Sequence, residues 1–411
     1  MPQALAGAHL VALLRELAPP IASTPVAFVD LDRIADSIRL IRTSCARASV
    51  AYAVKASYLR PLLNAAREAG AGISVFSELE LGLAREAGFA PHEIVYNGVG
   101  RHGAELGAAI EAGVRVNVES LGELRALLAA RPRGAASAAV GLRVNGAGGP
   151  AADSPEKYGV LGMSFADVGR CLDLAEDAGL TINALSFHLF ANQLNADRHL
   201  EFLDLLIPVI RKVSGHASAR FEHVNVGGGF ASRSEVGDAR AAAAAGAIGE
   251  RIEAELGLAT VFELGRFVAA DAEALVSRVV DVRATAAGQR VAILDATTNY
   301  LIPAPGHRFR AERLRPLDPG EACDEVRFVD RLGSDICRGS CGRLEPGSLV
   351  CVTNSGAYAG VMKERFVYPL PHIVFLGGGR VTAASPAGDI HDVMRHHDWH
   401  RIVQNTGARD R

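Results

Sequence analysis

The feature that most constrains the fold of this chain is a regular alternation of short β-type runs and amphipathic helical stretches between residues 50 and 262. The β-type runs lie at residues 50–54, 73–76, 94–96, 114–118, 140–144, 184–187, 224–226 and 261–262. Ser120 and Ser164 open two of the helical stretches. About eight βα units in about 215 residues are typical of a parallel (β/α)8 barrel. A doubly wound open sheet is the alternative, because periodicity does not show whether a sheet closes.

The pattern changes after Arg266, where β-type runs follow one another with Gly and Pro turns and little helix between them. These runs lie at residues 274–282, 291–294, 326–329, 348–352 and 373–376. We therefore expect an α/β chain in three parts. They are an N-terminal helix and strand (1–30), a (β/α)8 TIM-type barrel (31–266) and a C-terminal, mostly antiparallel β domain with a helical, His-rich tail (267–411).

Charge and cysteine content exclude several classes of function. The 411 residues carry 43 Lys and Arg against 46 Asp and Glu, so no nucleic-acid partner is expected. No apolar run is long enough to span a bilayer, and residues 1–17 lack the basic start of a secretory signal. The six cysteines lack the spacing of a disulfide framework. We expect a cytoplasmic protein with reduced thiols and no membrane partner.

Polar and glycine residues collect where the strands of the predicted barrel end. In strand order they are Lys55; Ser74, Ser77 and Glu80; Asn97; Asn117 and Glu119; Arg143 and Asn145; His188; Gly227, Gly228 and Gly229; and Glu263 with Arg266. Catalytic residues of (β/α)8 barrels lie at these strand ends. Packing alone does not explain such a convergence, so the sequence predicts one central pocket.

Three of these features define the chemistry of the pocket. Lys55 follows an apolar run, where burial favours a neutral amine that can form an imine with an aldehyde; the alternative is a surface lysine. The three glycines let backbone N–H groups approach a phosphate, unless they form only a flexible turn. Glu263 can hydrogen-bond a protonated pyridine nitrogen, unless it pairs with Arg266 nearby. With His188 beside the ring, these residues predict a site for pyridoxal 5′-phosphate (PLP).

Glu263 also indicates the type of reaction. A carboxylate keeps the ring nitrogen protonated, which makes the ring an electron sink after a bond to Cα breaks. A cationic partner would weaken that sink, as suits a racemase. The sequence therefore favours decarboxylation of a small amino-acid-type substrate.

The ordered motifs resemble those of fold-type III PLP-dependent enzymes, specifically the ornithine/diaminopimelate decarboxylase family, over residues 24–371. The matching segments are AYAVKA around Lys55, SFH ending at His188, VNVGGGF around Gly228, FELGRF around Glu263, GSDIC ending at Cys337 and NSGAYAG around Tyr358. The resemblance implies a head-to-tail homodimer with two shared active sites. It also implies that the N-terminal strand completes a C-terminal β-barrel.

Functional residues follow from the resemblance as predictions. Lys55, His188 and Cys337 are the predicted catalytic residues, with Cys337 entering from the other subunit to protonate Cα. The predicted cofactor-binding residues are Lys55, Ser74, Glu80, Arg143, His188, Asn192, Gly227, Gly228, Gly229, Glu263, Gly265, Arg266 and Tyr358. The predicted substrate-binding residues are Asn299, Tyr300 and Arg338.

Departures from the family pattern bear on the substrate. Arg338 follows Cys337 where relatives carry an acidic residue for a distal amino group, so a distal carboxylate is favoured; the alternative is that Arg338 faces solvent or forms an ion pair. The segment before Pro303 lacks the arginine that diaminopimelate enzymes carry. Ala191 replaces a phosphate-binding serine, so Asn192 or Gln193 would substitute for it.

These departures favour an altered substrate over ornithine, lysine or diaminopimelate. Relatives with altered pockets act on conjugates in siderophore and natural-product pathways, including citryl-diaminopropionate and carrier-bound glutamyl groups. Ser74, where the family often carries Asp, is a further departure.

Four other interpretations stay open. Simple ornithine, lysine or diaminopimelate decarboxylation is one, and a PLP-binding regulator is another. An amino-acid racemase is a third, with Tyr300 or Tyr358 as its second base. Zinc binding by Cys337 and Cys341 with a histidine is the fourth, although a single cysteine pair is weak evidence and we predict no metal.

Overall fold

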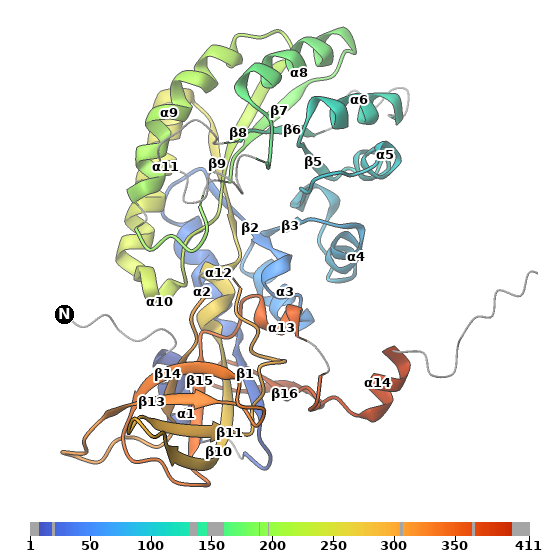
Figure 1. Cartoon of the computed structure of the whole chain (residues 1–411). Coiled ribbons are helices and arrows are strands. Elements are labelled where there is room, and N and C mark those ends of the chain that lie inside the picture. Colours follow the sequence, from blue (N-terminus) through green and yellow to red (C-terminus); the bar gives the residue numbers. More distant parts are fainter. Residues whose placement is uncertain are drawn as a thin grey trace, which may run out of the picture.

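The computed structural model describes residues 8–18, 21–130, 139–145, 160–188, 190–195, 197–304, 307–363 and 366–396. In Figure 1 a barrel surrounded by helices lies above a second, strand-rich part. The beginning of the predicted N-terminal helix and residues 397–411 of the predicted His-rich tail lie outside the described residues.

The eight predicted β-type runs form a closed parallel barrel. Its strands are β2 (Ala48–Ala53), β3 (Gly72–Val75), β4 (Ile94–Tyr96), β5 (Arg115–Val118), β6 (Val140–Arg143), β7 (Ile182–Ser186), β8 (Ala219–Gly227) and β9 (Ala259–Leu264). The first strand pairs with both β3 and the last strand, β9, which closes the ring. This closure confirms the TIM-type barrel and excludes the doubly wound open sheet.

Helices pack around the barrel where helical spacing predicts them. They are α2 (Leu31–Arg42), α3 (Arg60–Glu68), α4 (Glu78–Glu86), α5 (Gly103–Glu111), α6 (Leu121–Ala130), α8 (Phe165–Asp177), α9 (Asp197–Ser214), α10 (Arg233–Val236), α11 (Asp238–Leu256) and α12 (Arg266–Ala269). Ser164 caps α8, since its hydroxyl accepts a hydrogen bond from the Asp167 N–H at 3.2 Å. The apolar face of α2 buries Ile34, Ile38 and Ile41 against the barrel.

The second part is a mostly antiparallel sheet, as predicted. Its strands are β1 (Val26–Asp30), β10 (Glu273–Ala284), β11 (Arg290–Leu294), β12 (Arg310–Arg313), β13 (Asp324–Val329), β14 (Asp335–Cys341), β15 (Leu349–Thr353), β16 (His372–Gly377) and β17 (Arg380–Ser385). The main order is β14-β13-β11-β10-β1-β16-β17, with β15 pairing β10 and β12. Among the described residues β12 also packs beside β14, where the Ala311 carbonyl lies against Gly339, so the branches of the sheet come together as the predicted β-barrel requires.

Sequence patterns missed β12, β14 and β17. Both β14 and β17 lie at the ends of the strand order. Edge strands are half-exposed and tolerate polar side chains, so they lack a continuous apolar run. In β17 almost every residue is exposed.

The N-terminal segment belongs to this second sheet. β1 lies between β10, which it pairs in antiparallel fashion, and β16, which it pairs in parallel fashion. The helix α1 (Ala8–Leu17) buries Leu10, Val11 and Leu14 against β10 and β15. We propose on this basis that the chain divides near residues 30 and 266, with the N-terminal segment joined to the C-terminal domain.

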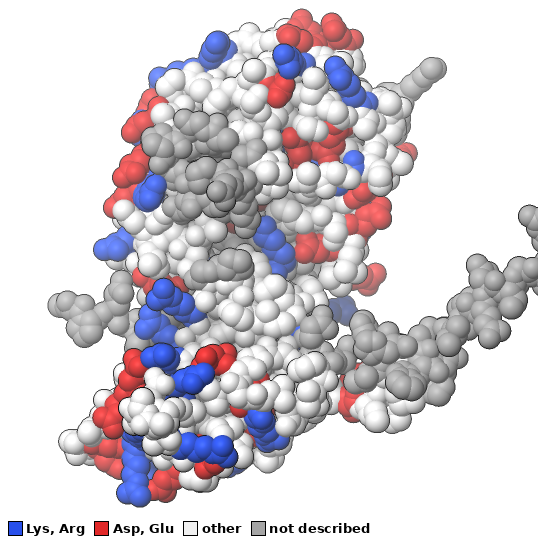
Figure 2. All heavy atoms as spheres, in the orientation of Figure 1, with Lys and Arg blue, Asp and Glu red and all other residues white. Residues whose placement is uncertain are grey.

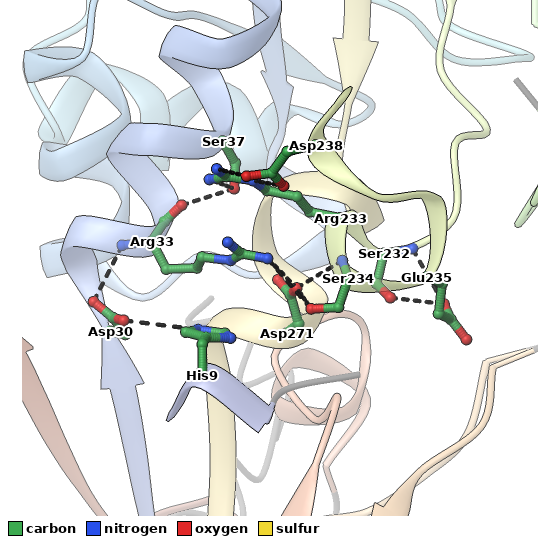
Figure 3. A network of polar contacts seen from close by, with 10 residues as sticks. All are labelled: His9, Asp30, Arg33, Ser37, Ser232, Arg233, Ser234, Glu235, Asp238 and Asp271. Carbon is green, nitrogen blue, oxygen red and sulfur yellow. Dashed lines mark hydrogen bonds and ion pairs between the residues drawn. The ribbon is translucent and has the colours of Figure 1, made fainter. Parts of the chain in front are cut away.

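A polar network ties the two parts together (Figure 3). Asp271, in the 3-10 turn η3 (Ala270–Ala272) before β10, is fully buried. It accepts hydrogen bonds from Arg33 of α2 at 2.8 Å and from the Ser234 N–H of α10 at 2.9 Å. Asp30, the last residue of β1, caps the same helix α2, since its carboxylate accepts from the Arg33 N–H at 3.1 Å. The network therefore fixes the barrel helices on the segment that leads into the second sheet.

Surface charge agrees with the balanced composition. Figure 2 shows acidic and basic side chains side by side over much of one face of the molecule. Within the described ranges no helix is both long enough and apolar enough to cross a bilayer.

Candidate active site

A cavity of about 290 Å³ lies at the carboxyl ends of the barrel strands. The predicted cofactor-binding residues that line it are Lys55, His188, Asn192, Gly229, Glu263, Gly265, Arg266 and Tyr358. Ala304, which follows β11, and Met362 of α13 (Ala359–Met362) line it as well. The cavity therefore joins the barrel to segments from the second half of the chain.

Lys55 lies in a 3-10 turn, η1 (Val54–Ala56), immediately after β2. Its side chain is half-buried, and its Nζ lies 3.8 Å from the centroid of the Phe76 ring. Burial raises the pKa of the neighbouring Glu80 carboxyl, while a hydrogen bond from the Phe76 N–H and the positive charge of Lys55 oppose that rise. The lysine thus lines the cavity, beside the Phe76 ring.

Glu263 is the second-last residue of β9 and is held by two amides. The Nδ2 groups of Asn97 and Asn225 each donate to its Oε1 at 2.8 Å. The carboxylate is 8% exposed, and among the described residues it has no ion-pair partner, so the expected alternative of a pair with Arg266 is not observed. A buried carboxylate with neutral donors keeps its negative charge available to a cation in the cavity.

The glycine loop after β8 brings its backbone close to the cavity. Gly227 and Gly229 have φ values of +71° and +93°, which glycine adopts without strain. A Cβ on either would collide with the carbonyl oxygen of Phe187 or Phe190. The Gly228 N–H donates to Nδ1 of His188 at 3.3 Å, which fixes that nitrogen as an acceptor. Only glycines therefore fit this loop, and of the three it is Gly229 that lines the cavity.

Arg266 reaches the cavity from the start of α12, with two aromatic neighbours. Its guanidinium donates to Nδ1 of His307 and lies 5.1 Å from the centroid of the Tyr358 ring. Burial, and then the charge of Arg266, lower the pKa of His307 to about 4, so this imidazole is neutral at pH 7 and can accept that hydrogen bond. Burial raises the pKa of Tyr358, which keeps its hydroxyl protonated as a donor.

Tyr358 reaches this position through a constrained backbone. Its φ is +69°, an uncommon value for a tyrosine, and its N–H donates to the Ala56 carbonyl at 2.7 Å. The segment after β15 is thereby fixed next to the turn that carries Lys55.

Two predicted cofactor-binding residues contact other side chains instead. Arg143 forms a buried ion pair with Glu119 at 2.6 Å, and the Ser74 hydroxyl accepts from Asn97 Nδ2 at 3.0 Å. Within the described part of the chain neither residue lines the cavity. Their contact with a cofactor stays a prediction.

Cys337 and Arg338 lie in β14 and, among the described residues of one chain, are not part of the cavity wall. Arg338 is largely exposed and pairs with Glu325 across the β13–β14 hairpin at 3.1 Å, which is the alternative that the sequence left open. Burial raises the pKa of the Cys337 thiol to about 12, so it is a protonated group. Their predicted roles require that a second subunit bring β14 to the cavity.

Asn299 and Tyr300 also lie outside the cavity wall as far as the described residues define it. The Tyr300 hydroxyl is buried and donates to Glu273 Oε1 at 3.0 Å. Asn299 Nδ2 donates to the Tyr368 carbonyl at 3.2 Å. Tyr300 is thus hydrogen-bonded to Glu273, while Tyr358 is the tyrosine that lines the cavity together with Lys55.

Sequence reasoning missed Asn225 and His307. Asn225 lies in a buried apolar stretch of β8, and a polar residue in such a stretch is a signal that could have been read. His307 follows a Gly-Pro-rich segment far from any barrel strand, and no local pattern pointed to its contact with Arg266. Within the described ranges no three metal-ligating side chains come together.

Comparisons with known proteins identify relatives of the chain. Residues 31–270 match the family model described as pyridoxal-dependent decarboxylase, pyridoxal binding domain. A diaminopimelate decarboxylase of Methanothermobacter thermautotrophicus is 28% identical over 90% of this chain and 91% of its own. An L-glutamyl-[BtrI acyl-carrier protein] decarboxylase of Niallia circulans is 27% identical over 82% of this chain and 84% of its own length. The crystal structure of a Helicobacter pylori diaminopimelate decarboxylase has the same fold, with a TM-score of 0.77 and 20% sequence identity. The match covers 92% of this chain and 97% of the Helicobacter pylori chain.

Proposed function

The chain belongs to the family of pyridoxal-dependent decarboxylases, and we propose that its substrate is an amino acid or amino-acid conjugate that carries a distal carboxylate. The protein is a PLP-dependent amino-acid decarboxylase. The observation that carries the proposal is the cavity in which Lys55, Glu263 and the glycine loop meet.

The residues of this cavity fit the cofactor. Lys55 offers an amine for the aldehyde, and Gly229, the glycine of the loop that lines the cavity, would let the backbone come close to the phosphate. Glu263 offers a buried carboxylate without a cationic partner among the described residues, as a protonated ring nitrogen requires. PLP supplies an electron sink for the electron pair that remains when a carboxylate leaves Cα.

The chain's own residues then have separate tasks. His188 lies against one wall of the cavity, where it can support the face of the ring. Arg266 adds positive charge beside Tyr358, whose protonated hydroxyl can donate to a phosphate oxygen. Cys337 of a second subunit would hold the proton that Cα receives, because a thiol with a pKa of about 12 is protonated at neutral pH.

Lys55→Ala tests the cofactor assignment. We expect loss of the visible absorbance of bound PLP and a fall of decarboxylase activity of roughly a thousandfold. The matched control is Lys212→Ala, on the exposed end of α9, which should keep both. A Lys55→Ala variant that keeps the absorbance would refute the role of Lys55.

The distal carboxylate is supported by Arg338 and by the absence of an arginine before Pro303 in the sequence. The relative named as acting on a carrier-bound L-glutamyl group adds support for a conjugated substrate. Citryl-diaminopropionate-like and glutamyl-type conjugates, as in siderophore biosynthesis, are the substrates that we propose first. Ornithine, lysine or diaminopimelate is the alternative, since several of the curated relatives are diaminopimelate decarboxylases.

Release of CO2 from a panel of free, citryl-linked and glutamyl-linked amino acids tests this proposal. In Arg338→Glu we expect the preference for distal carboxylates over distal amines, measured as the ratio of kcat/KM values, to fall by at least about tenfold. Arg343→Glu is the control, because Arg343 has a comparable exposed ion pair, with Glu345 at 2.8 Å. Equal selectivity of both variants would count against Arg338.

Racemisation is the second candidate reaction, because Tyr358 lines the cavity together with Lys55. A chiral assay of unreacted substrate separates it from decarboxylation. A PLP-binding regulator would show neither reaction. We also propose a homodimer with shared active sites. We propose a cytoplasmic location as well, which is supported by the six cysteines, all unpaired in the described chain.

A further inference from the structure

The carboxylate of Glu263 is held from two sides by side chains of other strands. Asn97, just after β4, and Asn225, in β8, donate to the same oxygen, Oε1, at 2.8 Å each. Both asparagines are 1% exposed. Two donors on one oxygen fix the plane of the carboxylate and leave its second oxygen, Oε2, for a donor in the cavity.

The orientation of both amides is set by further hydrogen bonds. Oδ1 of Asn97 accepts from Nδ2 of Asn117 at 2.8 Å, and Oδ1 of Asn225 accepts from the Gly227 N–H at 2.9 Å. With each amide oxygen engaged by a donor, each NH2 group faces Glu263, and the NH2 group of Asn97 also donates to the Ser74 hydroxyl at 3.0 Å. For Asn225 the partner of the amide oxygen is a backbone N–H, which can only donate, so the direction of this amide is set by the backbone.

Asn225 also connects two parts of the cofactor site. Its oxygen contacts the first N–H of the glycine loop, and its NH2 group contacts Glu263. The Asn225 side chain is thus hydrogen-bonded both to the glycine loop and to the Glu263 carboxylate. All these donors are neutral, so they orient Glu263 without cancelling its charge.

We propose that Asn97 and Asn225 are positioning residues that hold Glu263 in the orientation in which Oε2 meets the ring nitrogen of PLP. This inference rests on the proposed role of Glu263 at that nitrogen. Neither asparagine lines the cavity in the described structure, so both act through Glu263 rather than by touching the cofactor.

A double-mutant cycle on cofactor affinity tests the inference. Asn97→Ala and Asn225→Ala are made in the wild-type chain and in Glu263→Ala, and the Kd of each full-length apoprotein for PLP is measured by absorbance titration. In the wild-type background we expect each substitution to weaken binding by about tenfold, as for hydrogen bonds to a charged group. In the Glu263→Ala background we expect a change of no more than about twofold.

Asn183→Ala is the matched control, because this amide of β7 accepts from the Val140 N–H at 3.3 Å, in the same barrel but outside the Glu263 network. It should leave the Kd unchanged in both backgrounds. Thermal unfolding of each apoprotein checks the fold, and Asn97→Ser and Asn225→Ser replace any alanine variant that fails to fold.

Equal losses in both backgrounds, or no loss in either, would overturn the positioning role. The cycle measures binding and not turnover, so it remains informative if the wild-type chain binds PLP but releases no CO2 from any substrate. That result would reject the proposed function alone. A wild-type chain that does not bind PLP would reject both.

Discussion

Burial governs the ionisation of single residues behind the active site. Glu273, at the start of β10, is 2% exposed, and burial raises the pKa of its carboxyl from 4.5 to about 7 despite the hydrogen bond from Tyr300. The carboxyl thus binds a proton more tightly in the folded chain than in the unfolded chain. Its contribution to stability is fully present below about pH 4.5 and is lost as the pH rises through about 7.

Glu273→Gln should remove this pH dependence. A rise from 4.5 to about 7 corresponds to a loss of up to about 3 kcal/mol in the free energy of unfolding of the wild type. Urea unfolding of both proteins, followed by circular dichroism at a series of pH values, gives the difference between them. We expect the wild type to lose stability relative to the variant as the pH rises to neutrality. Parallel curves would show that Glu273 ionises normally.

At the level of elements, a buried charge pair joins helix α2 to the turn before β10. Arg33 and Asp271 are 2.8 Å apart, and the Asp271 side chain has no exposed surface. The Ser234 N–H of α10 donates to the same carboxylate. Removal of the carboxylate leaves a guanidinium that is only 15% exposed, and the Ser234 N–H group, without this acceptor.

Asp271→Ala should therefore destabilise the protein by about 3–5 kcal/mol. The double variant Arg33→Met with Asp271→Leu, which removes both charges and refills the volume, should be less destabilised than Asp271→Ala. Denaturant unfolding measures both. The exposed ion pair between Arg170 and Asp167 provides the control. Asp167→Ala removes this surface ion pair, which is worth at most about 1 kcal/mol. It also removes the hydrogen bond that the Ser164 hydroxyl donates to Asp167. A double variant as unstable as the single one would contradict the explanation.

At the level of the whole molecule, β14 holds Cys337 outside the described wall of its own chain's cavity. Lys55 lines the cavity, whereas Cys337 is partly buried and packs against the core of the second sheet. A homodimer with shared sites would supply Cys337 of each subunit to the cavity of the other. In such a dimer every active site combines Lys55 of one chain with β14 of its partner.

Subunit complementation tests this arrangement. Lys55→Ala and Cys337→Ala homodimers should each have little activity. When they are mixed and exchanged, half of the dimers are mixed and carry one intact site, so recovery of about a quarter of wild-type activity is expected. Sedimentation equilibrium confirms the dimer in each sample. Mixtures that stay inactive although subunits exchange would place both residues in the same chain's site.

Local sequence determined a large share of this protein. The eight β-type runs and their helices follow from alternating patterns, because buried strands and amphipathic helices impose their periods on the chain. Lys55, Glu263 and the three glycines were recognisable because few residue types can form an imine, accept from a protonated ring or approach a phosphate. The edge strands β14 and β17 were not recognisable, since a polar, half-exposed strand has little pattern.

Only the tertiary structure decided which side chains meet. Asn97 and Asn225 converge on Glu263 because closure of the barrel brings β4, β8 and β9 around one interior, and no sequence spacing encodes that meeting. His307 contacts Arg266 across 41 residues. Tyr300, which is predicted to bind the substrate, donates to the buried Glu273. Sequence thus determined the chemistry that this chain can perform, and long-range packing determined the geometry in which its residues are held.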